Sequence, residues 1–437
     1  MMITASEYQV RRARFIQQLG ADSIAILKAA PEKIRTGDTL YPYRQESHFY
    51  YMTGFMEPEA VAVFIPGRKE GEYILFNQPR DPELEIWIGR RVGQEDAVKE
   101  YRANEAYPIE KLNEIMPKLL EGKKHLYFSF GTCSEWDKQV NGWLNSIRQR
   151  VRSGVSAPEH FTHVDLPINE MRLFKTEAEI QVLRHSVQLS AKAHVEAMKF
   201  APKAAYEYEV EAVMWQYLCA RGCRSWAYEP IIGGGANTCV LHYNQNNAPL
   251  KHGDLLLIDA GGEYQYYSSD ITRTFPVSGK FSPEQRAVYE LVLKSQKAAI
   301  QAVKPGNLWD APQTAIVKIV TEGLVELGIL KGSVDELIQS GAYKPFYMHR
   351  SGHWLGLDTH DVGQYTLGNG QWRPFEPGMV LTVEPGLYIP ASKDVAPRWW
   401  NIGIRIEDDV LVTKEGCEVL SKDAPKEPDE IEALMVQ

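Results

Sequence analysis

Two aspartates lie eleven residues apart, in segments whose patterns predict paired β-strands. Asp259 ends the apolar run LLLID, and Asp270 begins the alternating segment DITRTFPV. A hairpin centred between Tyr264 and Gln265 would place the two carboxylates opposite each other, ~5 Å apart, where like charges are destabilising. A cation between them would turn this repulsion into attraction. The alternative is that Asp259 only caps a turn, because Asp and Gly are common turn residues.

A second pair of carboxylates follows the same arrangement further along the chain. Glu384 ends the apolar run MVLTVE before a Pro-Gly break, and Glu407 lies in the alternating segment GIRIEDDVLV. Each pair follows two helical segments, and this repeated order predicts an internal duplication. Because the carboxylates recur at corresponding positions of the two repeats, the sequence favours a functional site over two unrelated turns.

Four histidines accompany these carboxylates. His349, His353 and His360 occur in MHRSGHWLGLDTHDVG. The spacing of the first two matches a zincin HExxH helix, but Arg350 stands where that motif has Glu, and a glycine follows. Loop histidines with local hydrogen bonds are the alternative. His242, in GGGANTCVLHY, is the fourth candidate. The glycines before it do not form a phosphate-binding P-loop, because the Lys-Ser/Thr of that motif is missing.

Four carboxylates and one imidazole would form an oxygen-rich ligand set. Such ligands suit Mn²⁺, with Co²⁺, Fe²⁺ or Zn²⁺ as alternatives. The negative charge exceeds what one divalent ion requires, so we expect two ions ~3.5–4 Å apart, bridged by carboxylates and a water. A pair of this kind makes hydroxide available near neutral pH and stabilises a tetrahedral oxyanion.

The elements that must position these residues fall into two predicted domains of an α/β (α+β) protein. Residues 1–165 alternate strand-like and helix-like patterns, as in an α/β layer domain, with strands at 60–67, 72–79 and 125–131 and a helix at 110–122. A turn-rich stretch marks the boundary. Residues 166–437 carry the duplicated pattern, with helices at 175–200, 206–222, 284–304 and 309–328. Thr176 resembles the first residue of a capping box.

Composition excludes several classes of protein. The chain has 437 residues and a formal net charge of −9, without the Lys/Arg cluster that nucleic-acid binding requires. No apolar run approaches the ~20 residues of a membrane helix, and no secretory signal is visible. The five cysteines are odd in number and include no Cys-x-x-Cys pair, which argues against disulfides or structural zinc. We therefore expect a cytoplasmic protein with neither a membrane nor a nucleic acid as partner.

The ordered motifs resemble the pita-bread metallopeptidases, which include methionine aminopeptidase, prolidase and aminopeptidase P. The resemblance covers LLLIDAGGEYQYYSSDITRTF, HWLGLDTHDVG, TVEPGLYI and GIRIEDDVLV, in that order. Near the amino terminus, YPYRQESHFYYMTGF and EIWIGRRVG resemble the first domain of bacterial aminopeptidase P. This branch of the family cleaves the first residue from peptides with proline in second position.

The resemblance implies a role for each site residue. Two divalent ions would be bound by Asp259, Asp270, His353, Glu384 and Glu407. In this scheme Asp270 and Glu407 bridge both ions, a metal-bridging hydroxide attacks the scissile carbonyl, and Glu384 also carries a proton to the leaving nitrogen. His242 and His360 would stabilise the oxyanion.

Other implied residues shape the substrate site. His349 would line the proline pocket and Arg405 would support the site, while Asp38 and Trp87 are candidates to edge it from a first domain, often that of a neighbouring subunit. We therefore expect a homo-oligomer, a tetramer in the family pattern. Arg350 and Ser351 depart from the small residues expected there. An Xaa-Pro dipeptidase and a metal-free binding module on the same scaffold are the competing interpretations.

Overall fold

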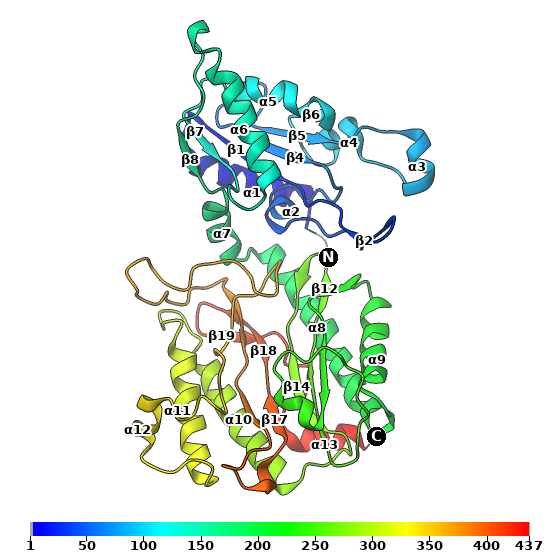
Figure 1. The fold of residues 1–437 in the computed structure, drawn as a ribbon, viewed down its shortest axis with the longest axis vertical. Coiled ribbons are helices and arrows are strands. Elements are labelled where there is room, and N and C mark those ends of the chain that lie inside the picture. The colour runs from blue at the N-terminus through cyan, green and yellow to red at the C-terminus, as the bar shows by residue number, and fades with distance from the viewer. Residues whose placement is uncertain (1–2, 437) are drawn as a thin grey trace. The chain divides into compact units, whose positions relative to one another are not determined.

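The computed structural model describes residues 3–436, which divide into two compact units, Ile3–Arg172 and a second that begins at Leu173 (Figure 1). Helix α7 (Asp165–Leu173) starts at the boundary expected from the sequence and ends where the two units divide. Both units mix helices with strands. None of the described helices is both long and apolar enough to cross a membrane.

Within the described part of the first unit, six strands form one sheet in the order β6-β5-β4-β1-β7-β8. Its strands are β1 (Ser23–Lys28), β4 (Val61–Phe64), β5 (Tyr73–Asn77), β6 (Glu105–Pro108), β7 (His125–Tyr127) and β8 (His160–Thr162), and β2 (Ile34–Thr36) pairs separately with β3 (Thr39–Leu40). The helices besides α7 are α1 (Ala5–Gln18), α2 (Ser47–Thr53), α3 (Pro82–Ile88), α4 (Gly93–Lys99), α5 (Leu112–Leu120) and α6 (Ser134–Arg148). The predicted strands and the predicted helix are confirmed.

The second unit repeats one order of elements, two helices and then strands. The first repeat contains α8 (Glu177–Phe200), α9 (Glu207–Cys219), β9 (Ser225–Trp226), β10 (Ile231–Gly234), β11 (Leu255–Asp259), β12 (Gly262–Tyr264), β13 (Tyr267–Ser268) and β14 (Thr272–Pro276). The second contains α10 (Pro283–Ala302), α11 (Ala311–Glu326), α12 (Val334–Ser340), β15 (Val380–Val383), β16 (Gly386–Ile389), β17 (Ile402–Arg405), β18 (Asp408–Val412) and β19 (Cys417–Val419). The predicted duplication of element order is present.

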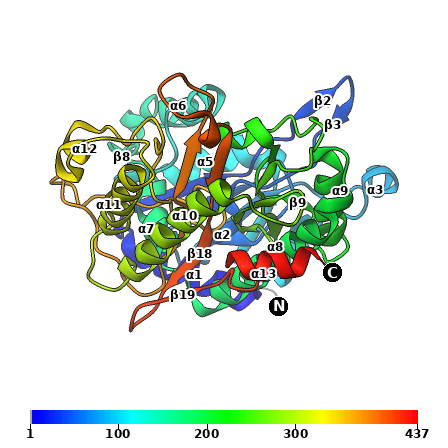
Figure 2. The same ribbon diagram turned by 90° about the horizontal axis from the view of Figure 1, so that it is seen from below.

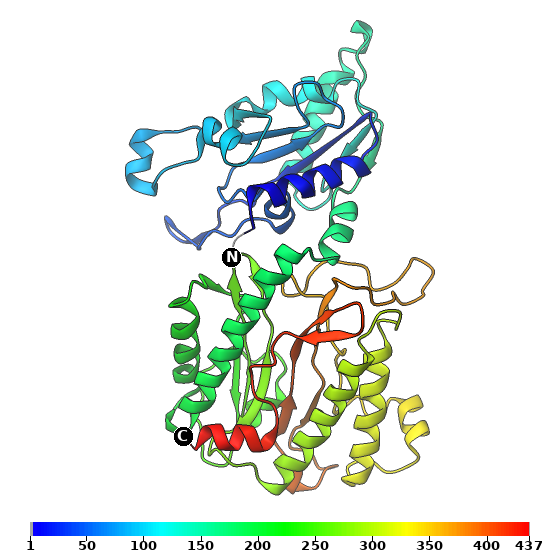
Figure 3. The ribbon, with the colours of Figure 1, turned by 180° about the vertical axis from the view of Figure 1, so that it is seen from behind.

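Helices α8 and α10 begin in the same way and cross the same face of the strands. Thr176 and Ser282 each form a capping box with the residue three positions on, which confirms the signal predicted at Thr176. Both helices pass in front of the strands in Figure 3. The terminal helix α13 (Pro428–Met435) packs against both and lies across the base of the unit in Figure 2. Apolar faces of these helices and the strands form one large core.

The first carboxylate pair lies in a hairpin whose register differs from the expected one. Strands β11 and β14 pair so that Asp259 faces Thr272, and not Asp270. The turn consists of Gln265 and Tyr266, one residue later than predicted, with φ of +50° and +69°. Both residues are left-handed, as a two-residue type I′ turn requires, but neither is the Asn, Asp or Gly that normally signals it. The expected register was therefore wrong.

The observed register still keeps the two aspartates on one face of the hairpin. Moving the turn by one residue changes the partner of Asp259 by two positions, and side chains two apart in a strand share a face. Asp270 falls instead opposite Gly261, between β13 and β14. A Cβ on Gly261 would lie 1.8 Å from the carbonyl oxygen of Ser269, so only glycine fits this close approach.

The second carboxylate pair is directly opposed. Strand β15 pairs with β18, with Val383 opposite Asp408, and β16 pairs with β17, with Gly386 opposite Arg405. Glu384 and Glu407 occupy the break between these two pairings, where the same register places them across from each other. The sequence interpretation of this segment as two paired strands is confirmed.

Candidate active site

Nine of the residues selected from the sequence line one cavity in the second unit. Its volume is about 480 Å³, and its lining includes Asp259, Asp270, His353, Glu384, Glu407, His242, His349, His360 and Arg405. These residues come from strand ends and loops that are distant in the chain. The fold therefore brings together every site residue that was selected from the second unit.

Three of these side chains stand close enough to hold one metal ion. A carboxylate oxygen of Asp270, a ring nitrogen of His353 and a carboxylate oxygen of Glu407 all lie within 4.8 Å of one another. Nε2 of His353 is 3.3 Å from Oδ2 of Asp270 and 3.8 Å from Oε1 of Glu384. Two carboxylates therefore face the same imidazole nitrogen.

Tyr228 links the two aspartates of the first pair. Its hydroxyl oxygen lies 2.5 Å from Oδ1 of Asp259 and 2.6 Å from Oδ1 of Asp270. Burial, followed by the charges of these two carboxylates, raises the pKa of Tyr228 well above its ordinary value. The phenol therefore stays protonated and brings the two carboxylates together.

The ring of His353 is oriented by the backbone around it. Its Nδ1 lies 3.0 Å from the carbonyl oxygen of Trp354, so an N–H there leaves Nε2 to face the carboxylates. The backbone N–H of His353 donates to Oγ1 of Thr382, and the N–H of Thr382 donates back to the His353 carbonyl. A Cβ on Gly352 would come within 2.0 Å of the Thr382 carbonyl oxygen, which explains this glycine.

Asp259 is paired with a buried arginine. Arg405 donates from Nη2 to Oδ2 of Asp259 at 2.6 Å and from Nη1 to the hydroxyl oxygen of Tyr388 at 2.8 Å. The Tyr388 hydroxyl lies 2.9 Å from Nε2 of His349, whose Nδ1 lies 2.8 Å from the Arg350 carbonyl oxygen. Burial and the nearby positive charge of Arg405 lower the pKa of His349 to about 4, so this imidazole is neutral.

Burial of so many carboxylates has an electrostatic cost. It raises the pKa of Glu384 to about 7 and raises the pKa of Asp270 and Glu407 above their ordinary values, with neighbouring carboxylates adding to the effect. Burial alone would lower the pKa of His353, but its contact with Asp270 outweighs burial and raises it to about 9. Divalent cations would reverse these penalties, so the residues fit the metal centre predicted from the sequence.

His360 lies beside His353, on a loop with its own anchor. The two ring centroids are 4.3 Å apart in an edge-to-face arrangement. Burial, and then the charge of His353, lower the pKa of His360. The next residue, Asp361, accepts a 3.0 Å hydrogen bond from Nζ of Lys175, and both side chains of this ion pair are only 1% exposed. This pair fixes the loop that carries His360 into the cavity.

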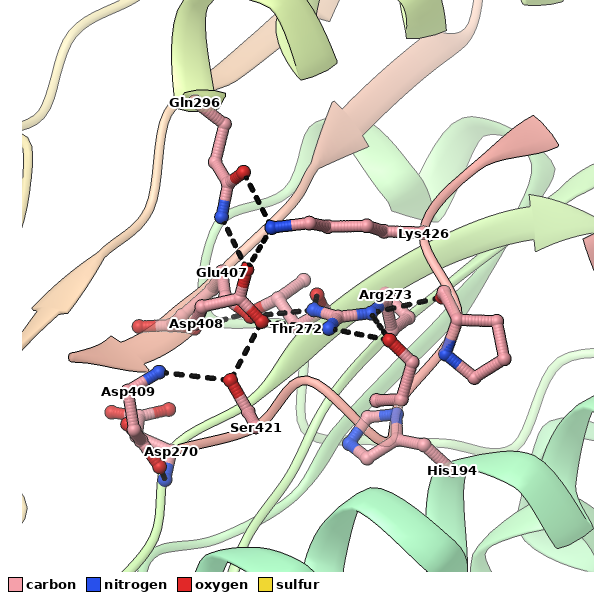
Figure 4. Close-up of polar contacts among 12 residues, drawn as sticks. His194, Asp270, Thr272, Arg273, Gln296, Glu407, Asp408, Asp409, Ser421 and Lys426 are labelled. Atoms are coloured by element: carbon pink, nitrogen blue, oxygen red, sulfur yellow. Dashed lines mark hydrogen bonds and ion pairs between the residues drawn. The ribbon is translucent and has the colours of Figure 1, made fainter. Parts of the chain in front are cut away.

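A buried arginine ties together the strands behind the carboxylates (Figure 4). Arg273, on β14, donates to the carbonyl oxygen of Glu407 at 2.6 Å and to Oδ1 of Asp408 at 2.7 Å. It also donates to the carbonyl oxygens of Thr272, Ala424 and Pro425. Asp408 further binds Gln296, Ser421 and Lys426. One guanidinium therefore joins the first repeat, the second repeat and the segment before α13.

Two further hydrogen bonds on the same side involve the candidate metal ligands themselves. The hydroxyl of Thr272 donates to Oε2 of Glu407 at 2.6 Å, and the backbone N–H of Asp270 donates to Oδ2 of Asp409 at 3.0 Å. Asp409 is fully buried, and burial raises its pKa well above the ordinary value. Its other oxygen, Oδ1, has no hydrogen-bond partner. Thr272 of the first repeat therefore positions Glu407 of the second, and Asp409 of the second repeat positions Asp270 of the first.

The two candidates from the first unit are both exposed. Asp38 lies in the turn between β2 and β3, and Trp87 lies near the end of α3 with 84% of its surface accessible. They belong to a different compact unit from the cavity. Their predicted role at the edge of the site stays a prediction.

Sequence reasoning missed several residues that the site depends on. Tyr228, Tyr388 and Arg273 each make two or more of the contacts described above. Arg273 carried a signal, because an arginine inside the buried alternating strand TRTFP must find partners for its charge. The two tyrosines carried none, since a tyrosine beside apolar residues is ordinary core composition.

The chain is similar to known proteins along nearly its whole length. Residues 181–414 match the model of metallopeptidase family M24, and residues 8–127 match the amino-terminal domain of aminopeptidase P. The Xaa-Pro aminopeptidase of Escherichia coli K12 is 44% identical over 435 residues, covering 99% of this chain and 98% of the relative. That of Haemophilus influenzae is 43% identical, covering 98% of this chain and 97% of the relative.

Solved structures extend the similarity to the fold. The aminopeptidase PepP of Pseudomonas aeruginosa superposes with a TM-score of 0.97 at 48% identity, covering 99% of this chain and 98% of that one. A zinc-substituted E. coli aminopeptidase P in complex with product also gives 0.97, at 44% identity, covering 100% of this chain and 99% of that one. With both domain types present in one continuous full-length match, the chain belongs to metallopeptidase family M24, in its aminopeptidase P group.

Proposed function

We propose that this protein is a metal-dependent Xaa-Pro aminopeptidase, which removes the first residue from peptides with proline in second position. The observation that carries the proposal is the cavity where Asp259, Asp270, His353, Glu384 and Glu407 converge from both repeats. Full-length similarity to Xaa-Pro aminopeptidases supports the same activity.

The centre would hold two divalent ions, for which we propose Mn²⁺. Carboxylates dominate the donor set, and hard oxygen donors favour Mn²⁺ over ions that prefer nitrogen or sulfur. Asp270 and Glu407, each with a carboxylate oxygen within 4.8 Å of a ring nitrogen of His353, would hold these ions together with that imidazole. When bound, such a pair supplies hydroxide at neutral pH and neutralises developing oxyanion charge.

The protein's own residues would carry the proton and orient the peptide. Glu384, with a pKa raised by burial to about 7, can accept a proton and release it to the departing proline nitrogen. His360 and His242 line the cavity beside the carboxylates and could donate hydrogen bonds to the substrate carbonyl oxygen. The substrate's free amine would pair with the acidic side chains, which limits cleavage to the first residue.

Selectivity for proline follows from what an X-Pro bond lacks. It has no N–H, and the pyrrolidine ring fixes φ, so an enzyme that binds that N–H loses a contact. Neutral His349 lines the cavity beside the acidic centre, backed by the ring of the buried Tyr388, and offers a surface without charge for that pyrrolidine ring. This arrangement supports a proline pocket, as the family resemblance implies.

A homotetramer and a cytoplasmic location complete the proposal. Ile86, Trp87 and Ile88 of α3 are 81%, 84% and 63% exposed, and a run of apolar surface of this kind is typical of subunit contacts. Light scattering should give the mass of four chains. A monomer with full activity at the assay concentration would contradict assembly through α3.

The test of the activity is a panel of Xaa-Pro peptides assayed after chelation and again after Mn²⁺ is restored. Chelation should abolish cleavage and Mn²⁺ should recover it. Cleavage of Xaa-Pro-Yaa tripeptides supports an aminopeptidase, whereas cleavage of Xaa-Pro dipeptides alone indicates a dipeptidase. Purified protein that binds no metal and cleaves neither would be the metal-free binding module. Full turnover with metal verifiably absent would contradict the mechanism.

A further inference from the structure

Arg350 is an exposed cation that lines the wall between two cavities. It borders the 480 Å³ cavity of the candidate active site and a second cavity of about 560 Å³, lined also by Trp372, Tyr343 and the acidic residues Asp310, Glu322 and Asp335. A peptide that extends from the first cavity toward the second would pass this residue.

The two arginines of the active-site cavity differ in what they bind. Arg405 is buried and donates to Asp259 and Tyr388. Arg350, in contrast, makes no ion pair with a carboxylate among the residues that the structure describes. Its charge is therefore free to meet an anion that enters the cavity.

Two contacts orient Arg350, and neither is a hydrogen bond from its guanidinium N–H groups. Its carbonyl oxygen lies 2.8 Å from Nδ1 of His349, whose other nitrogen contacts Tyr388. Its guanidinium carbon lies 5.4 Å from the ring centroid of Trp372. Stacking of this kind orients an arginine while its N–H groups remain available for a carboxylate.

The charges at the two ends of the cavity are complementary to the charged termini of a short peptide. The buried end carries Asp259, Asp270, Glu384 and Glu407, and the exposed side carries Arg350. A peptide with free termini has a cationic amine and an anionic carboxylate. Its amine is attracted to the acidic end, so its carboxylate points toward Arg350.

We propose that Arg350 is a specificity residue that binds a carboxylate on the leaving side of the substrate, and so favours short peptides with a free carboxyl terminus. The proposal rests on the function proposed above. An aspartate or glutamate side chain just after the proline offers the same chemistry, and the experiment separates the two sources. Arg350 binds substrate but touches no reacting atom.

The experiment compares kcat/KM for Ala-Pro-Ala with a free carboxylate, the same peptide with a terminal amide, and an amidated Ala-Pro-Asp. We expect the free acid to exceed the neutral amide by about fivefold, the scale of one exposed charge pair. Arg350→Ala should remove this preference by slowing the free acid alone, through KM. Arg350→Lys should keep part of it, and added salt should weaken it in the parent protein.

Arg398→Ala is the matched control, because Arg398 is also exposed and stacked on a tryptophan, Trp399 at 5.0 Å, but does not line the cavity. Arg398→Ala should leave kcat/KM unchanged for all three peptides. Amidated Ala-Pro-Asp cleaved as fast as the free acid identifies any carboxylate as sufficient, whereas slow cleavage identifies the chain terminus. Equal rates for acid and amide in the parent overturn the role of Arg350. Failure to cleave any of the peptides overturns the proposed activity itself.

Discussion

His360 and His353 touch each other but have different surroundings. His353 faces two carboxylates through Nε2, whereas His360 packs edge-to-face against the His353 ring and lines the cavity. His360→Ala should therefore retain metal while kcat falls by roughly 10²-fold, the scale of one lost oxyanion donor. His353→Ala should weaken metal binding itself. Metal analysis and kinetics on both variants provide the measurement.

Two results would overturn this assignment. If His360→Ala loses metal and His353→Ala retains it, the two roles are reversed. If His360→Ala is as active as the parent, His360 is a loop histidine without a role in the reaction.

Arg273 offers a second test at the level of single residues. It is fully buried and binds Asp408 and the backbone of Glu407, so Arg273→Met leaves a buried carboxylate with fewer partners. We expect a loss of about 3–5 kcal/mol in the free energy of unfolding. Lys426→Met removes another partner of Asp408, but the Lys426 side chain is 20% exposed, so the loss should be smaller. Urea unfolding of both variants measures the difference, and equal losses would argue against a structural role specific to Arg273.

At the scale of elements, the close crossing at Gly261 can be tested against a glycine in open space. Gly261→Ala would place a Cβ 1.8 Å from the Ser269 carbonyl oxygen and should destabilise the protein by roughly 1–3 kcal/mol. Gly142 lies inside α6 with no atom within 4 Å of such a Cβ, so Gly142→Ala should stabilise by about 0.5–1 kcal/mol. Thermal unfolding should therefore shift in opposite directions. A harmless Gly261→Ala would contradict the crossing.

The same scale shows how far the sequence could predict the structure. Periodicity and caps located the helices, and apolar runs located β11 and β15, because these signals are local. The register of the first hairpin could not be predicted, because Gln265 and Tyr266 adopt left-handed conformations without a residue type that signals them. Tyr228 and Tyr388 were missed for a related reason: their function depends on partners distant in the chain, which no local pattern contains.

At the scale of the whole molecule, the acidic cluster should make stability depend on both pH and metal. A carboxyl whose pKa is raised on folding, such as Glu384 at about 7, contributes stability below its unfolded value of ~4.3. That contribution is lost as the pH rises through the folded value. The contribution of Glu384 to the stability of the metal-free protein should therefore fall between about pH 4.5 and pH 7.

Mn²⁺ should then raise the melting temperature more at pH 8 than at pH 5.5, because it stabilises the ionised carboxylates and does not compete there with protons. Melting curves with chelator and with Mn²⁺ at both pH values provide the measurement. Glu407→Gln, which removes one of the buried charges, should reduce the difference between the Mn²⁺-induced shifts at the two pH values. An equal shift at both pH values would show that the carboxylates are already ionised without metal.

The convergence of Asp259 and Glu407 from separate repeats also has a consequence for how the chain folds. Neither repeat alone contains the whole cluster, so its charges meet only after contacts between distant segments have formed. Contacts of such long sequence separation slow folding, since the loop entropy is lost before they form. Bringing four carboxylates together without divalent cations adds a late electrostatic barrier. Refolding should therefore accelerate when divalent cations are present from the start, while the early collapse of the helices stays unchanged.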